Sequence, residues 1–211
     1  MTDYKRLSKD TFDREAADFD GPERAGHIRT LYPQLRPILA GLTFASVLDI
    51  GCGTGELLAH LTEWGQIQLA GLDIAPNMIA AAQAKLGPQV DLRVGDAESL
   101  PWEPTSFDLV LCTNSFHHYP DPNRSLTEMR RVLKRNGHLV LVDISFPSAL
   151  RLIVNLLLPL MRTGEVHFYS ENETRLLFAR NGFQVIRWQT PEFGSFIVIA
   201  QPDPFNQERK K

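Results

Sequence analysis

An apolar segment that ends in an acid runs directly into a loop of alternating glycines. The segment spans residues 47–50 and contains Asp49, and the loop glycines are Gly51, Gly53 and Gly55. Glycine lacks Cβ and tolerates positive φ, so this backbone can turn sharply and let a ligand approach the main chain. A helical pattern begins at Glu56, and the N–H groups at a helix start favour an acidic ligand group. The loop therefore predicts a nucleotide-like ligand.

Polar residues also follow three later apolar segments. They are Asp73, Asp96 and Asn114. Asp73 follows the loop by about the interval at which a second-strand carboxylate meets a ribose hydroxyl, and Asp96 could accept a hydrogen bond from an exocyclic amine. Any one of them is also typical of a turn or a helix cap. Together they indicate one ligand site at one edge of a sheet.

The alternation of apolar and helical patterns predicts a mainly parallel sheet that is covered on both faces. Strands are expected at residues 47–50, 68–73, 91–94, 108–112, 138–143, 183–188 and 196–200. Helices are expected at residues 56–63, 76–86, 122–134 and 171–181, with Gly65, Gly87, Gly137 and Gly182 as C-terminal caps. In such a fold the carboxyl ends of the strands bind the ligand.

Several of these segments together resemble a known family. They are residues 47–55, 71–74 with Met78, 95–102, 107–110, 117–122 and 128–142. The pattern resembles class I S-adenosylmethionine-dependent methyltransferases, especially the small-molecule branch that includes quinone-biosynthesis enzymes. The resemblance implies a Rossmann-like, doubly wound sheet of seven mostly parallel strands. It also implies the strand order 3-2-1-4-5-7-6, an antiparallel strand 7, helices on both faces and a small helical cap.

The resemblance further implies which residues bind S-adenosylmethionine. The glycine loop would pass under the methionine moiety and the ribose, Asp49 would position the amino acid end, and Asp73 would accept from the ribose hydroxyls. Ile74 and Met78 would pack on the adenine, whose amine would meet Asp96. The full implied set is Asp49, Gly51, Cys52, Gly53, Gly55, Asp73, Ile74, Met78, Asp96, Ala97 and Asn114. The product would be S-adenosylhomocysteine.

The reaction makes modest demands on side chains, because a sulfonium methyl is already activated and the acceptor has only to be held in line with it. A general base is needed only if the acceptor carries a proton when it attacks. His117 and His118 are the catalytic candidates, although packing without proton chemistry is the favoured interpretation of each. Candidate substrate contacts are Tyr4, His27, Tyr119, His167 and Tyr169. No metal is expected, because adjacent histidines cannot readily face one ion.

Length and composition indicate a single domain over residues 1–211, with 43% hydrophobic and 22% charged residues. Residues 1–43 are expected to form an N-terminal helical cover, and residues 145–169 a cap insertion. Within the insertion, residues 149–161 are apolar on more than one helical face. We expect this helix to be buried against the sheet or in a dimer interface, in a monomer or homodimer. The alternatives are a lid over a partly apolar acceptor and peripheral contact with a membrane surface.

Charge and targeting signals restrict the class of partner. A net charge of −3 does not attract a phosphate backbone, so nucleic acid is not expected as the main partner. The first residues lack the apolar core of a signal peptide, and no apolar run is long enough to span a bilayer. Cys52 and Cys112 indicate free thiols. Together these features predict a cytoplasmic protein. The acceptor is expected to be a small molecule, partly apolar or quinone-like.

Two other functions remain open. A nicotinamide-dependent oxidoreductase would place glycine or alanine at position 56, whereas Glu56 here would face the pyrophosphate of NAD. A noncatalytic S-adenosylmethionine-binding protein would keep the same pocket, because methyl transfer needs no indispensable side chain.

Overall fold

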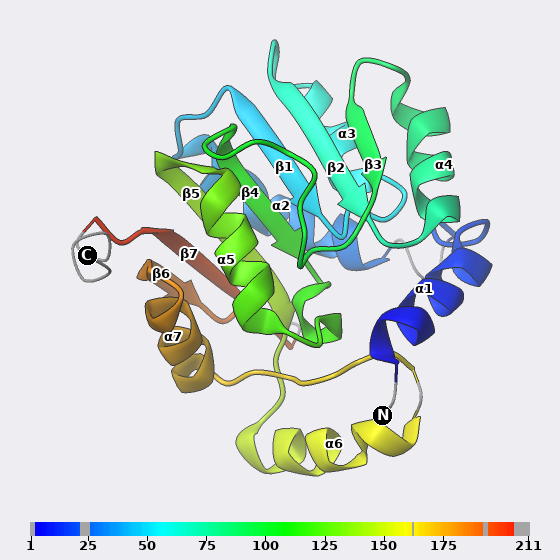
Figure 1. The fold of residues 1–211 in the computed structure, drawn as a ribbon, viewed down its shortest axis with the longest axis vertical. Coiled ribbons are helices and arrows are strands. Elements are labelled where there is room, and N and C mark those ends of the chain that lie inside the picture. The colour runs from blue at the N-terminus through cyan, green and yellow to red at the C-terminus, as the bar shows by residue number, and fades with distance from the viewer. Residues whose placement is uncertain (1–2, 22–25, 162, 192–193, 205–211) are drawn as a thin grey trace.

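The computed structural model describes residues 3–21, 26–161, 163–191 and 194–204, without the side chains of residues 26–29. Seven strands form one sheet (Figure 1). They are β1 (Ser46–Ile50), β2 (Gln68–Asp73), β3 (Asp91–Val94), β4 (Phe107–Thr113), β5 (Leu133–Ile144), β6 (Phe183–Gln189) and β7 (Ser195–Pro202). The helices are α1 (Tyr4–Glu15), α2 (Gly26–Ala40), α3 (Glu56–Thr62), α4 (Pro76–Leu86), α5 (Pro122–Val132), α6 (Ser148–Met161) and α7 (Glu171–Arg180), with a short 3-10 helix η1 (Phe116–His118).

The strand order confirms the predicted doubly wound fold. The order is β3-β2-β1-β4-β5-β7-β6. The five strands from β3 to β5 pair in parallel, and β7 runs antiparallel to both β5 and β6. The order reverses at β1, so the carboxyl ends of β1 and β4 flank the crevice where such folds bind ligands.

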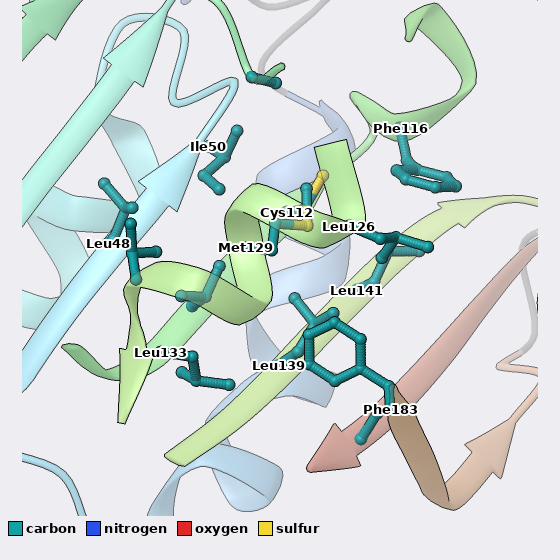
Figure 2. Packing of buried hydrophobic residues seen from close by; sticks show 14 of the residues in the cluster. Leu48, Ile50, Cys112, Phe116, Leu126, Met129, Leu133, Leu139, Leu141 and Phe183 are labelled. Atoms are coloured by element: carbon teal, nitrogen blue, oxygen red, sulfur yellow. The ribbon is translucent and has the colours of Figure 1, made fainter. Parts of the chain in front are cut away.

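The two faces of the sheet support separate apolar layers, because successive side chains of a strand point to opposite faces. On one face Leu48, Leu139 and Leu141 pack with Met129 of α5 (Figure 2). On the other face Val47 and its neighbours pack with α2 and α3. Both layers fix the positions of the strand ends that form the ligand site.

Strand pairing overrides the predicted end of one helix. Residues 122–134 were expected to be helical, but α5 ends at Val132, because Leu133 already pairs with Phe107 of β4. Gly137 was expected to cap that helix and instead lies within β5, where a Cβ would come within 2.7 Å of the Asp108 carbonyl oxygen. Gly65 is likewise no immediate cap, since α3 ends at Thr62. Close approach between strands explains the glycine at position 137.

Helix α6 does not pack against the sheet, so the expectation that it is buried there is wrong, whereas burial in a dimer interface stays a prediction. Leu158 is its one buried side chain, and all residues of α6 are described. Leu152, Leu156 and Leu160 are 67%, 78% and 77% exposed. Figure 1 shows α6 below the main body, apart from the layers around the sheet. In the part of the chain that the structure describes, no helix is long and apolar enough to cross a bilayer.

Candidate cofactor and acceptor site

A cavity of about 240 Å³ lies at the carboxyl ends of β1, β2 and β4. Its floor comes from the glycine loop between β1 and α3, and Phe12 and Phe19 line it from the N-terminal segment. A smaller cavity of about 50 Å³ adjoins it and shares Gly51, Asp73 and His118 with it. The strand-end residues singled out from the sequence therefore meet at one site.

The glycine loop is held by backbone geometry that side chains would disturb. Gly51, Gly53 and Gly55 have φ values of 74°, 54° and 76°, in the region that favours glycine. A Cβ on Gly51 would overlap the side chain of Ser115. Gly55 is the N-cap of α3 and does not line the cavity. Its missing Cβ leaves room for Leu86 of α4. The first two glycines shape the cavity, and the third packs two helices.

Two buried carboxylates lie side by side beneath this loop. Asp49 is 1% exposed, and its Oδ1 atom has no hydrogen-bond partner. Burial, with the neighbouring Asp73 charge, raises the pKa of Asp49 to about 7. Asp73 accepts hydrogen bonds from the backbone N–H groups of Ala75 and Gly53, both at 2.9 Å. Burial raises the pKa of Asp73 to about 6, although these bonds oppose the shift.

The smaller cavity contains the third-strand acid. Ile74, Asp96 and Ala97 line it, whereas Met78 lines the larger cavity. Asp96 Oδ1 accepts from the backbone N–H of Glu98 at 2.9 Å, and Lys5 of α1 donates to Asp96 Oδ2 at 2.7 Å. Asp96 is thus already hydrogen-bonded to helix α1.

The adjacent histidines differ in their partners. His117 is 4% exposed, and its Nδ1 atom lies 2.5 Å from Oδ1 of Asp143 at the end of β5. His118 Nδ1 lies 3.3 Å from the Ser8 hydroxyl. Burial lowers the pKa of His118 to about 4. Both rings line the larger cavity.

Comparison with known proteins agrees with this architecture. A methyltransferase domain family matches residues 48–141. Demethylmenaquinone methyltransferase of Desulfitobacterium hafniense is 31% identical over 186 residues, which are 75% of this chain and 74% of that protein. The chain therefore belongs to the class I S-adenosylmethionine-dependent methyltransferases.

Other relatives in the family match a shorter part of their own length. Ubiquinone biosynthesis O-methyltransferase of Xanthomonas euvesicatoria is 37% identical over 146 residues, which are 65% of this chain and only 59% of that protein. A chain solved in complex with the Haloferax volcanii Trm112 methyltransferase activator shares the fold, with a TM-score of 0.76 and 21% identity. That alignment covers 91% of this chain and 97% of the other.

One buried acceptor at the site would suit the charged amino acid end of S-adenosylmethionine. S-adenosylmethionine carries an α-ammonium group, and the unpartnered Oδ1 of Asp49 is a buried acceptor that lacks a donor. Cys52 and Asn114 line the same cavity, and Asn114 has a φ of 49°. A positively charged, hydrogen-bonding group beside Asp49 would satisfy both its charge and its open lone pairs.

The predicted substrate contacts are not brought together. Tyr119 lines the smaller cavity and exchanges a hydrogen bond with Ser115 at 2.7 Å. Tyr4, His167 and Tyr169 line neither cavity, and His167 pairs with Glu173. The side chain of His27 falls outside the described residues. Within the described ranges, no group of three or more His, Cys, Asp or Glu side chains could hold a metal ion.

The prediction from sequence missed several residues at the site. Thr113, Ser115 and Ile144 line the larger cavity, and Asp143 holds the ring of His117 by a hydrogen bond. The available signal for Asp143 was an acid at the end of a fifth predicted strand, in the same position as Asp73 on the second. Phe12 and Phe19 belong to the N-terminal segment that was expected to cover the site, and both line the larger cavity.

Proposed function

We propose that this chain transfers a methyl group from S-adenosylmethionine to a small-molecule acceptor. One observation carries the proposal: a buried Asp49 oxygen without a partner lies beneath the glycine loop and beside the cavity. An α-ammonium group would supply the missing donor and favour the ionised carboxylate. NAD would instead bring a pyrophosphate toward Glu56, which lines the cavity and pairs with Lys85 at 2.8 Å. The site therefore favours the sulfonium compound.

Each strand end has a distinct role in this proposal. Asp73 accepts from the ribose hydroxyls with the lone pairs that its backbone bonds leave open. Met78 and Ile74 pack against the adenine from the two cavities, and Asp96, with the Ala97 backbone, meets its amine. Asn114 follows β4 and lines the larger cavity, and its proposed role is beside the methionine amine and the sulfonium.

The chain mainly positions the reactants and excludes water. S-adenosylmethionine supplies an electrophilic methyl group on a sulfonium when it is bound. Phe12 and Phe19 cover the cavity with apolar surface, which keeps water from competing with the acceptor. We propose that residues 1–43 form this cover and residues 145–169 the cap, within one domain.

The proposed acceptor is partly apolar or quinone-like. Two of the relatives bear names that concern ubiquinone and menaquinone. The aromatic cover and Ile144 give the cavity an apolar wall that suits a flat ring. These features support the acceptor class for this chain.

Calorimetry with S-adenosylmethionine, S-adenosylhomocysteine and NAD tests the cofactor. We expect both sulfur compounds to bind and NAD to give no measurable heat. Tight NAD binding without a response to either sulfur compound would refute the proposal.

Incubation of labelled S-adenosylmethionine with fractionated host extract then tests turnover. Binding without labelling of any compound would favour a noncatalytic binding protein.

A further inference from the structure

The carboxylate of Asp143 is surrounded by N–H donors, two of them from His117. Asp143 is 1% exposed at the end of β5. Its Oδ2 accepts from the His117 backbone at 2.9 Å, and its Oδ1 accepts from the Ile144 backbone at 2.8 Å. The same Oδ1 lies 2.5 Å from His117 Nδ1. One buried carboxylate thus fixes both the backbone and the ring of His117.

This contact determines which nitrogen of His117 is available. An ionised carboxylate only accepts hydrogen bonds, so Nδ1 donates and the lone pair of the neutral ring lies on Nε2. The ring also stacks on Phe168, with centroids 5.1 Å apart. Nε2 has no hydrogen-bond partner among the described residues, and His117 lines the larger cavity. The ring is held in place with a free acceptor atom beside the site.

His118 lacks this arrangement. Its Nδ1 faces the Ser8 hydroxyl at 3.3 Å, and Ser8 in turn donates to the Gly164 carbonyl at 3.1 Å. No carboxylate among the described residues bonds to the His118 ring. A general base is usually oriented by a third group, which is a buried carboxylate for His117 and only a neutral hydroxyl for His118.

We propose that His117 is the general base for methylation of an aromatic hydroxyl group and that Asp143 is the residue that positions it. This inference rests on the proposed function. The hydroxyl proton passes to Nε2, and the oxygen keeps the electron pair of the broken O–H bond. That oxygen forms the new bond to the methyl carbon, while the electrons of the S–CH₃ bond stay on sulfur. The ring then releases its proton to solvent, which restores neutral His117.

The acceptor class follows from acidity and from the cavity wall. An aromatic hydroxyl has a pKa near 10, as in tyrosine, close enough to imidazole for proton transfer to assist attack. Alkyl hydroxyls are much weaker acids, and a neutral amine attacks before it loses a proton. Phe12, Phe19 and Ile144 supply apolar walls for a ring. Together these features favour a phenol-type acceptor.

The ionisation of 4-nitrophenol tests the base without any turnover, because its anion is yellow and its neutral form is not. We would add it to the wild-type complex with S-adenosylhomocysteine, at a pH below the pKa of free nitrophenol. Bound probe is expected to be anionic. In His117→Gln and Asp143→Asn, bound probe is expected to stay neutral. His138→Gln is the matched control, since His138 lies on β5 away from the cavity and bonds to Gln201. It should behave as wild type.

Methylation of catechol tests the same residues by kinetics. His117→Gln and Asp143→Asn should lower kcat by about 100-fold or more, with KM for catechol within about threefold. If Asp143→Asn does not fold, His117→Gly carries the test, and added imidazole should restore part of its kcat. If the wild-type protein binds S-adenosylhomocysteine but neither ionises nitrophenol nor methylates catechol, this inference is overturned and the proposed cofactor is not. Ionisation that survives in both variants would also overturn it. Failure to bind S-adenosylhomocysteine would refute the proposed function instead.

Discussion

The strand-end wall of the cavity and its helical cover are held in different ways. The strand-end wall, formed by residues after β1, β2 and β4, is fixed by buried backbone bonds such as Gly51 N–H to the Leu72 carbonyl at 2.8 Å. The helical cover, formed by α1 and the segment to Asp20, is fixed by polar contacts near the surface, such as Lys5 with Asp96 at 2.7 Å. Cofactor binding needs groups in fixed positions, whereas entry of ligands needs a wall that can open. The strand-end wall therefore provides the fixed groups, and the helical cover provides the wall that can open.

The largest expected effect comes from the strand-end wall. Asp73→Ala removes the proposed acceptor for the ribose and leaves the N–H groups of Gly53 and Ala75 without a partner. Hydrogen bonds to charged groups contribute about 1.5–3 kcal/mol each, so we expect the Kd for S-adenosylhomocysteine to rise at least about 100-fold. Calorimetry measures this change.

Asp91→Ala is the matched control for Asp73→Ala. Asp91 begins β3, pairs with Arg93 at 2.8 Å and lies outside both cavities. Its loss should leave the Kd within about twofold. A similarly small change in Asp73→Ala would contradict the assigned ribose contact and the difference between the two walls.

The second expected effect is a dependence of cofactor affinity on pH. Burial raises the pKa of Asp49 to about 7, and a bound ammonium group needs the ionised form. Affinity should therefore rise roughly tenfold per pH unit up to about pH 7 and decline above about pH 7.7, where an α-amino group loses its own proton. Titration calorimetry from pH 5.5 to 8.5 measures it. In Asp49→Asn the rise below pH 7 should be much smaller.

The same carboxylate should destabilise the ligand-free protein at higher pH. Between its ordinary pKa of 3.8 and about 7, Asp49 holds a proton in the folded state that the unfolded state has lost. Its contribution to the free energy of unfolding therefore falls as pH rises through this range. We expect Asp49→Asn to gain stability over wild type between pH 5 and 8 in urea unfolding. A constant difference across that range would contradict the raised pKa.

A smaller effect is expected in the helical cover. Lys5 of α1 forms ion pairs with Asp96 at 2.7 Å and with Glu98 at 2.5 Å, and its side chain is 33% exposed. Ion pairs of this exposure contribute at most about 1 kcal/mol each, so Lys5→Met should weaken cofactor binding about three- to tenfold. The release rate of S-adenosylhomocysteine in stopped-flow mixing should rise by a similar factor. Lys9→Met, whose ion pair with Asp13 stays within α1, is the control. Equal effects in both would count against a link between cover and strand.

The two walls also differ in how far the sequence predicts them. Strand β3 and helix α4 have the predicted bounds, because proline, glycine and acidic residues mark their ends locally. The contact of His117 with Asp143 joins residues 26 positions apart, and that of Lys5 with Asp96 joins residues 91 apart. Gly137 failed as a predicted cap for the same reason, since β4 lies against it. Local signals locate the strand ends, but pairings across the fold determine what closes over them.

The smallest expected effect lies farthest from the strand-end wall, on α6. Leu152, Leu156 and Leu160 are mostly exposed, so replacing all three with Gln should move Tm by no more than about 2 °C and leave the cofactor Kd unchanged. Leu158→Ala, in the same helix but only 3% exposed, should lower the free energy of unfolding by about 2 kcal/mol or more. Calorimetric unfolding of both variants measures the contrast. A large drop in Tm for the triple variant would mean that α6 packs on the body in solution. If stability is unchanged, loss of co-sedimentation with lipid vesicles would identify a membrane surface as the contact of this apolar face. Loss of a dimer in analytical ultracentrifugation would instead identify a second copy of the chain.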